Sequence, residues 1–545
     1  MVGFAITSFE GVEPKTDPLL LRGNQAQTAL NCRLWNGHLR PWRDTQFIVT
    51  PTKAGTKLTI YRIGESLTNE AQYWLHWLTD VDAARGPIHG DASERTYYTG
   101  DGVPKVTNLA LAIGGGTNYP QTSYSLGAPK PVNTPNVALG GGGSGTAVTR
   151  NYVYTYVSGF GEEGQPSTAS ANISAMPGQS VTVSNMSVAP AGGYNITQKR
   201  IYRLVTGDTG EVYLLAGEIA VGTTSFADNL ADSALSTVLP SFIPGEVGSA
   251  WDVPPADMHS IIALPAFMAG LSKTDVCLSE TFQPHAWPIR YQNALDYTAV
   301  GQAAIDQDIL VLTTGNPYLG TGSDPGAVRF NKVTDKQACV SKRSIVDMGR
   351  GIAYASPDGL MYFGPGRFEV ATRKVMDRDD WQALKPESIH GTLWEGRYLG
   401  FYDNGITQGG FLFDPNDARS ELTFIGVYAT AGYNDPLRDG LYLQIGTEIR
   451  RWDATGLLTF TWRSKKIRFD RPRNMGVAQV TADGPVTFKW YADDVLRHTQ
   501  TVTSKEPFRL PAGYTAESGY VELSGTNTIR PPVLVAETIA DLKQS

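Results

Sequence analysis

Short segments in which apolar and polar residues alternate run through most of the chain. The alternation is clear at residues 56–64, 71–81 and 151–158, and a period of two residues is typical of a β-strand with one buried face. Asp101 and Gly102 form a dipeptide that favours a tight hairpin turn. Because turn residues follow such segments along nearly the whole sequence, the pattern predicts an all-β fold.

Two segments depart from this pattern and predict helices. Apolar residues at helical spacing, beginning with Ala26 and Ala29, predict a helix within residues 22–37 that ends at Gly37. A second short helix is predicted for residues 536–543, at the end of the sequence.

Between residues 246 and 456 one unit recurs, namely a strand, a turn rich in glycine and aspartate, and a strand that contains aromatic residues. It is found at 352–363, 392–402 and 441–452. Repeated hairpins without helices favour a β-propeller, whose radial closure leaves few exposed strand edges. The repeat is too degenerate to give the number of blades.

Residues 149–240 form a separate group of about six or seven predicted strands without a helix. The strongest signal is a hairpin over residues 198–219, with Gly207 to Gly210 at its turn. This pattern is typical of an immunoglobulin-like or fibronectin-type sandwich. A propeller interrupted by this sandwich, and followed by a small β-sandwich module, is therefore the predicted fold.

The predicted domain order has four parts. Residues 1–138 hold the N-terminal helix and the first part of the propeller, 139–245 the inserted sandwich, 246–456 the rest of the propeller, and 457–545 the C-terminal β module.

A run of four glycines, Gly140 to Gly143, precedes the inserted sandwich. A phosphate-binding loop would need glycines between a strand and a helix, often followed by Lys and Ser or Thr. Here a predicted strand follows, and no Gly-Lys-Ser/Thr occurs. The run is therefore interpreted as a flexible linker, a hinge between the propeller and the insert.

The overall charge limits the class of partner. The 545 residues include 46 Lys and Arg against 53 Asp and Glu, a net charge of −7. This balance argues against a protein that coats nucleic acid, which needs many phosphate contacts. No apolar run approaches the roughly 20 residues of a membrane span, and no secretory signal is visible.

The sequence offers no visible catalytic, metal or cofactor site. The three cysteines, Cys32, Cys277 and Cys339, are far apart and predict buried, reduced thiols. No two histidines lie within five residues of each other, and no nucleophile elbow occurs. The acidic clusters 377–381 and 491–494 could form a carboxylate pair of a glycosidase, but turns also favour aspartate, and the structural interpretation is preferred.

The densest positive stretch spans residues 463–473. A solvated strand face is one interpretation, and a contact to DNA phosphates or to an acidic partner is the other. The candidate contact residues are Arg463, Lys465, Lys466, Arg468, Arg471 and Arg473.

Three stretches in the same chain, 17–43, 277–325 and 508–542, together resemble tail nozzle proteins of short-tailed bacteriophages, the tail tubular protein B type. Residues 17–43 are similar to the family's opening, in which a small helix leads into a Gly-x-Leu-x-Pro turn. Residues 277–325 resemble the family's propeller core, and residues 508–542 resemble its C-terminal module. The insert, with residues 152–167, is similar to fibronectin-type units found in phage structural proteins.

The resemblance implies a structural virion protein and no enzyme. It implies a homo-oligomeric ring, a hexamer, at the distal end of a short phage tail, assembled in the cytoplasm of the host bacterium. Its partners would be the tail adaptor or head-to-tail connector protein, tail fibres or spikes, and the double-stranded viral DNA that passes through its channel. A net-acidic chain suits such a conduit, because many phosphate contacts would hold the DNA back.

Two other functions stay open on the sequence. A host-surface glycan-binding tail protein could stack sugars on exposed aromatic residues such as Trp35, Trp42, Trp74 and Trp77, although buried aromatic residues are common in propellers. A propeller glycosidase would need two carboxylates roughly 5–9 Å apart in a concave site.

Overall fold

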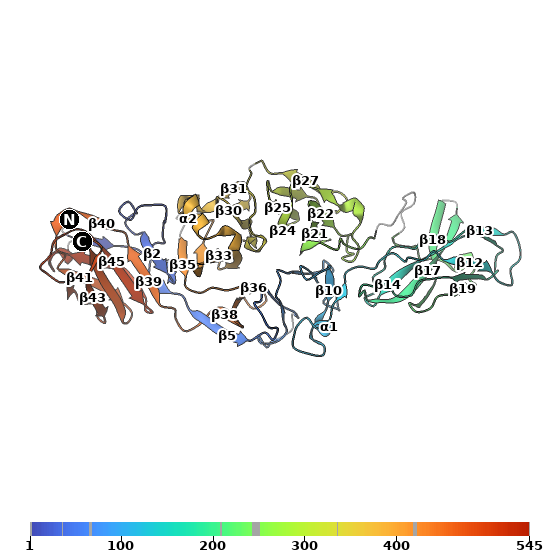
Figure 1. Cartoon of the computed structure of the whole chain (residues 1–545), viewed down its shortest axis with the longest axis horizontal. Coiled ribbons are helices and arrows are strands. Elements are labelled where there is room, and N and C mark those ends of the chain that lie inside the picture. The colour runs from blue at the N-terminus through green and yellow to red at the C-terminus, as the bar shows by residue number, and fades with distance from the viewer. Residues whose placement is uncertain are drawn as a thin grey trace. The chain divides into compact units, whose positions relative to one another are not determined.

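The computed structural model describes residues 3–34, 36–64, 68–207, 210–241, 251–334, 336–417 and 422–543, and it is almost entirely β (Figure 1). It divides into two compact units, residues 1–72 with 335–545, and residues 73–334. We call them unit 1 and unit 2 and describe each by itself. The predicted all-β fold is confirmed.

Unit 1 contains three antiparallel four-stranded meanders of the kind that forms propeller blades. The first comprises β28 (Val346–Asp347), β29 (Ile352–Ser356), β30 (Gly359–Gly364) and β31 (Arg367–Val370). The second comprises β32 (His390–Trp394), β33 (Arg397–Asp403), β34 (Gln408–Phe413) and β35 (Leu422–Ile425). The third comprises β36 (Ala431–Asp435), β37 (Gly440–Ile445) and β38 (Glu448–Thr455), and it takes its fourth strand, β5 (Asp44–Val49), from the N-terminal part of the chain.

Unit 2 contains three further meanders of the same design. The first comprises β8 (Asp82–Arg85), β9 (Thr96–Thr99), β10 (Lys105–Thr107) and β11 (Tyr124–Ser125), with the short helix α1 (Leu109–Ile113) between its last two strands. The second comprises β20 (His259–Ala263), β21 (Met268–Ser272), β22 (Asp275–Leu278) and β23 (Asn293–Ala294). The third comprises β24 (Ala299–Ile305), β25 (Asp308–Thr313), β26 (Tyr318–Thr321) and β27 (Arg329–Lys332).

In the sequence, the inserted sandwich comes between the first two meanders of unit 2. Its sheets are β12-β16-β19, β14-β17-β18 and the pair β13-β15. These strands are β12 (Asn136–Leu139), β13 (Val148–Arg150), β14 (Tyr152–Ser158), β15 (Ile173–Ala175), β16 (Val181–Ser184), β17 (Ile196–Gly207), β18 (Gly210–Ala220) and β19 (Phe226–Asp228). Tyr152, Tyr154 and Tyr156 point into the core, as their period of two requires. The hairpin predicted over 198–219 is confirmed by β17 and β18; positions 208 and 209 of its turn lie outside the described residues.

The glycine run is a loop within the sandwich, so its interpretation as a hinge at a domain boundary was wrong. Strand β12 precedes the glycines and already pairs with β16, from Asn136 opposite Ser184 to Leu139 opposite Val181. The insert therefore begins before the predicted boundary at residue 139. The predicted end at 245 lies outside the described residues.

Ion pairs and hydrogen bonds join the insert to the meanders of unit 2. Glu162 accepts a hydrogen bond of 2.6 Å from Arg95, and both side chains are more than nine-tenths buried. The Nε2 atom of buried His285 lies 2.8 Å from the carbonyl oxygen of Glu163. The loop after β14 therefore holds the insert in place through buried polar contacts.

The C-terminal module consists of two packed sheets that include strands from the N-terminus of the chain. One sheet has the order β1-β46-β41-β44, and in the other β2 is followed by β39, β45, β42 and β43, with β40 also paired to β45. The strands are β1 (Gly3–Ile6), β2 (Ala26–Leu30), β39 (Phe460–Ser464), β40 (Ile467–Arg473), β41 (Val477–Ala482), β42 (Val486–Ala492), β43 (Val495–Val502), β44 (Phe508–Arg509), β45 (Ala516–Gly525) and β46 (Ile529–Ala536).

The helix predicted within residues 22–37 was wrong, because the described part of this segment forms β2 and β3 (Cys32–Arg33). The pairing of β2 with β39 shifts register between Ala26 and Thr28. This irregularity places both Ala26 and Ala29, three residues apart, in the core. The two buried positions therefore have the spacing expected of one face of a helix.

The helix predicted for residues 536–543 was also wrong. Strand β46 continues to Ala536, which pairs with Gly3 and with Val477. Only a 3₁₀ turn, Asp541–Lys543, follows it. No helix in the described part of the chain is both long and apolar enough to cross a membrane.

Candidate interaction surfaces

The basic stretch 463–473 runs along the C-terminal module, from the end of β39 into β40. Arg463 forms an ion pair of 2.5 Å with Glu522 on the neighbouring β45, and Lys489 pairs with the same carboxylate at 2.9 Å. The Arg463 guanidinium also lies over the rings of Tyr491 and Tyr520, 5.6 Å from each centroid. Burial raises the pKa of Glu522, but the hydrogen bonds from Lys489 and Arg463 outweigh it, and the net pKa is lowered. Arg463 is therefore held within the module.

The two lysines of the stretch also have local partners. Lys465 donates a hydrogen bond of 2.6 Å to the carbonyl oxygen of Leu21. Lys466 forms an ion pair of 2.6 Å with Asp494. Both contacts tie the turn between β39 and β40 to other segments of unit 1, so neither lysine extends freely into solvent.

Only part of strand β40 presents unpaired positive charge. Arg473 forms ion pairs with Asp470 at 2.6 Å and with Glu537 at 2.8 Å. Arg468 and Arg471 are exposed and form no ion pair with any described residue. Of the six predicted contact residues, these two are the ones that could meet phosphates directly.

The acidic clusters 377–381 and 491–494 act in local structure, as preferred from the sequence. Asp377 caps helix α2 (Arg378–Ala383), and its side chain accepts a hydrogen bond of 2.8 Å from the backbone N–H of Asp380. Asp493 accepts hydrogen bonds from the backbone of Glu517 and Ser518. Among the described residues, no group of three or more His, Cys, Asp and Glu side chains could hold a metal ion.

Three of the four tryptophans considered for sugar stacking are core residues. Trp42, Trp74 and Trp77 are 1 to 3% exposed, so they cannot stack on a ligand at the surface. Trp35 lies outside the described residues. The glycan-binding interpretation based on Trp42, Trp74 and Trp77 was wrong.

A second cluster of arginines, missed in the sequence, lines a groove of about 550 Å³ in unit 1. Short strands β3 and β4 (Arg40–Pro41) pair so that Arg33 lies opposite Arg40, and Arg43 follows one residue after buried Trp42. Arg33 is paired with Glu395 at 2.8 Å, whereas Arg40 and Arg43 are exposed. The signal was present as three arginines within residues 33–43, but their spacing has no regular period.

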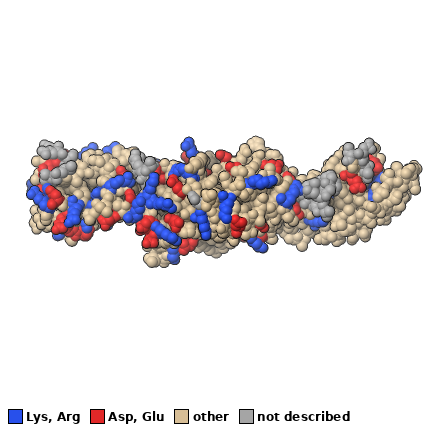
Figure 2. Space-filling view, turned by 90° about the horizontal axis from the view of Figure 1, so that it is seen from above, with Lys and Arg blue, Asp and Glu red and all other residues tan. Residues whose placement is uncertain are grey.

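Charges of opposite sign are mixed on the face that Figure 2 shows, and Lys and Arg form no continuous strip there. Pairing of this kind reduces the field that a polyanion would meet, because each ion pair is nearly neutral at distances beyond about a Debye length, ~8 Å at physiological salt.

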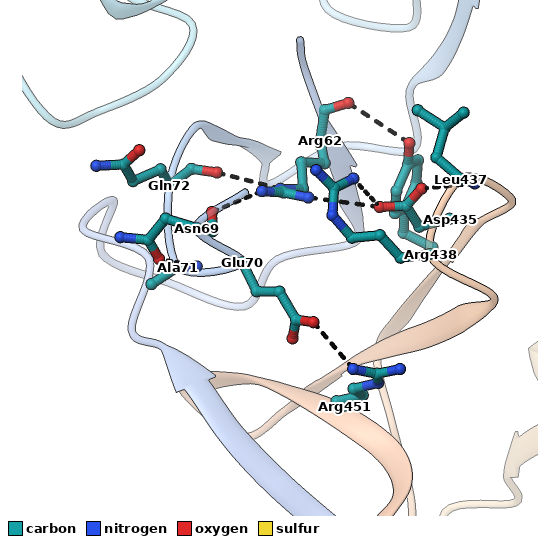
Figure 3. A network of polar contacts seen from close by, with 10 residues as sticks. Arg62, Asn69, Glu70, Ala71, Gln72, Asp435, Leu437, Arg438 and Arg451 are labelled. Carbon is teal, nitrogen blue, oxygen red and sulfur yellow. Dashed lines mark hydrogen bonds and ion pairs between the residues drawn. The ribbon is translucent and has the colours of Figure 1, made fainter. Parts of the chain in front are cut away.

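A network of polar contacts, with Arg62 and Asp435 buried within it, joins the segment after β6 to the β36–β38 meander in unit 1 (Figure 3). Arg62 is the last residue of β6 (Thr59–Arg62). Its guanidinium donates a hydrogen bond of 2.6 Å to the carbonyl oxygen of Asn69, and its Nη1 atom lies 3.5 Å from a carboxylate oxygen of Asp435. Asp435 also pairs with Arg438 at 2.8 Å, and Glu70 pairs with Arg451 at 2.9 Å. The network fastens residues 69–72 to the meander β36–β38.

Comparisons with known proteins give no family. No family model matches the sequence, and no curated protein matches it. Among solved structures, the chain is similar to the extracellular domain of a hybrid two-component system from B. thetaiotaomicron, with a TM-score of 0.29, 9% identity, and coverage of 88% of this chain and 47% of that chain. The chain thus spans about half the length of that structure.

Two other solved structures show likeness of the same order. BamB from Moraxella catarrhalis has a TM-score of 0.26 and 11% identity, with 55% of this chain and 90% of that chain covered. PorZ from Porphyromonas gingivalis has a TM-score of 0.25 and 10% identity, with 85% of this chain and 82% of that chain covered. Scores this low carry no argument about function.

Proposed function

We propose that the chain is a structural subunit of a short phage tail, a nozzle protein of which six copies form a ring around the path of the genome. The observation that carries the proposal is the way distant parts of the sequence share sheets within unit 1. Strand β1 pairs with β46, near the other end of the chain. Strand β2 lies between β35 of a blade and β39 of the C-terminal module.

These shared sheets give a wall segment resistance to mechanical load. In unit 1, separating the module from the blades requires β2 to lose its hydrogen bonds to β35 or to β39. Trp462 on β39 adds contacts to the N-terminal part of the chain. Its ring packs edge-on against Phe9, with 4.9 Å between the ring centroids, and its indole N–H donates a hydrogen bond of 3.0 Å to the carbonyl oxygen of Glu10. A subunit that guides DNA under pressure needs cohesion of this kind, while its chemistry can be minimal.

Assembly of purified full-length protein tests the proposal. We expect mass photometry to show a species of six times the 59.0 kDa chain mass, and electron-microscope class averages to show a ring with a central hole. Assembly should be tested alone and with a tail adaptor ring, because the adaptor could template the ring. A chain that stays monomeric in both conditions would contradict the proposal.

The candidate DNA contact at β40 has a separate test. Each phosphate contact contributes about 0.9 to the slope of log affinity against log salt concentration. We expect the double variant Arg468→Ala/Arg471→Ala to reduce that slope by about 2 for a short DNA duplex, measured by fluorescence anisotropy. Arg530→Ala is the matched control, because Arg530 is exposed but paired with Asp483 at 2.9 Å. An unchanged slope in the double variant would rule out the contact.

A further inference from the structure

A cleft of about 870 Å³ opens at one end of the inserted sandwich. Its walls come from three loops, residues 129–133 before β12, 184–194 after β16, and 224–225 before β19. Loops at the end of such a sandwich are the usual place for recognition, because the sheets hold them rigidly while their sequence is free to vary. The volume lies within the range of small-molecule sites, ~300–1,000 Å³.

The lining of this cleft carries almost no charge. Lys130 is its one charged side chain among the described residues. The segment from Gly164 to Gln198, which supplies most of the lining, contains no charged residue and no histidine. Arg203 and Asp228 of the insert form a fully buried ion pair away from the lining. A strongly charged ligand would therefore find little to neutralise it.

The polar groups at the floor of the cleft are satisfied by the protein itself. The hydroxyl of buried Tyr156 donates a hydrogen bond of 2.7 Å to the carbonyl oxygen of Val188. Behind the lining, the hydroxyl of Tyr154 donates a hydrogen bond of 3.1 Å to the carbonyl oxygen of Asn133. The first bond holds the 184–194 loop against the sandwich and the second holds the 129–133 loop, so the cleft is preformed.

Other polar groups of the lining have no hydrogen-bond partner among the described residues. They are neutral donors and acceptors that face solvent, namely the side chains of Asn133, Ser184, Tyr194, Thr224 and Ser225. Hydroxyl and amide groups each offer both donor and acceptor capacity. A ligand rich in hydroxyl groups matches this set.

Apolar surface lies beside these groups. The Tyr194 ring is half-buried and packs against the sandwich core, which fixes its orientation. Val132 and Val188, which are 87% and 55% exposed, also line the cleft. An aromatic ring with one packed side and a polar tip suits a ligand whose own faces are apolar C–H and whose edges are hydroxyl.

We propose that this cleft binds a neutral oligosaccharide. Sugar rings combine apolar faces with equatorial hydroxyl groups, which matches one fixed tyrosine ring among unpaired neutral polar groups. A peptide added as a strand would need the open edge of a sheet, whereas this lining is made mainly of loops. The inference does not depend on whether the chain forms a nozzle ring.

Binding of full-length protein to neutral tetrasaccharides tests the inference. The probes are maltotetraose, cellotetraose, laminaritetraose and chitotetraose, measured by isothermal titration calorimetry and saturation-transfer NMR, beside a sulfated and a sialylated oligosaccharide of similar length. We expect at least one neutral probe to bind and the anionic probes to bind at least tenfold more weakly. Tyr194→Ala should lower the affinity for the neutral probe by at least tenfold.

Ser225→Arg keeps the test independent of folding, because Ser225 is exposed and a long side chain there fills the cleft without entering the core. It should weaken binding as strongly as Tyr194→Ala. The matched control is Ser174→Arg, an exposed position on β15 outside the lining, which should bind normally. No binding by any neutral probe, stronger binding of the anionic ones, or normal binding by Ser225→Arg would overturn the inference. Ring formation in the same sample reports on the proposed function separately.

Discussion

Replacing Asp228 by alanine is expected to destabilise the inserted sandwich by about 3–5 kcal/mol, because it removes the fully buried counter-charge of the Arg203 guanidinium and leaves only the partly exposed carboxylate of Asp232. Arg203 and Asp228 are both fully buried, 2.7 Å apart, and Tyr152 donates a further hydrogen bond of 2.8 Å to the same carboxylate. Hydrogen exchange measured by mass spectrometry should show β14 and β17 exchanging about 100- to 3,000-fold faster, at tenfold for every 1.4 kcal/mol.

Asp232→Ala is the matched control for this change. Asp232 also contacts Arg203, at 2.7 Å, but its side chain is 46% exposed and water can replace it. We expect a loss of at most ~1 kcal/mol. If the two substitutions destabilise the insert equally, burial does not explain how much the Arg203–Asp228 pair contributes to its stability. Peptides from unit 1 should exchange at the wild-type rate in both variants.

The second large effect is expected for Asp435→Ala in unit 1. Asp435 is the carboxylate at the centre of the network in Figure 3, and its loss leaves buried Arg62 uncompensated. Arg62 holds the backbone carbonyl of Asn69, so residues next to Glu70 should open more often. We expect about 3 kcal/mol of local destabilisation, and therefore roughly 100-fold faster native-state cleavage after Glu70 by a glutamate-specific protease.

Arg438→Ala provides the comparison, because Arg438 contacts the same carboxylate from a more exposed position, with 19% of its side chain accessible. It leaves the Arg62–Asp435 contact in place, so cleavage after Glu70 should rise by less than about tenfold. If both variants are cleaved at the wild-type rate, the network does not control opening of this segment.

Among the features that could be predicted from the sequence, the strands and their hairpins were the clearest. Their period of two residues identified β14, and the glycines beside positions 208 and 209 marked the hairpin of β17 and β18. The structural interpretation of the acidic clusters also followed from local chemistry, because an aspartate at a helix start or turn bonds to nearby backbone. Both signals are local, so a single sequence contains them.

The candidate sites were harder to predict from the sequence, because each depends on neighbours that are distant in the chain. Nothing near Arg463 in the sequence indicated that Glu522, 59 residues later, would neutralise it. The cleft of the insert likewise combines residues from 129 to 225, and its lack of charge becomes meaningful only once those loops meet. A count of basic residues therefore overestimated the positive charge that β40 presents.

The sequence by itself determined the β-strand content, the recurring hairpins and the presence of an insert, because alternation and turn residues act within a few positions. Only the tertiary structure decided that β1 and β2 complete the C-terminal module, that the glycine run is a loop inside the sandwich, and that Trp42 is a core residue. Each of these outcomes depends on which strand finds which partner, and hydrogen bonding between strands places no limit on their separation along the chain.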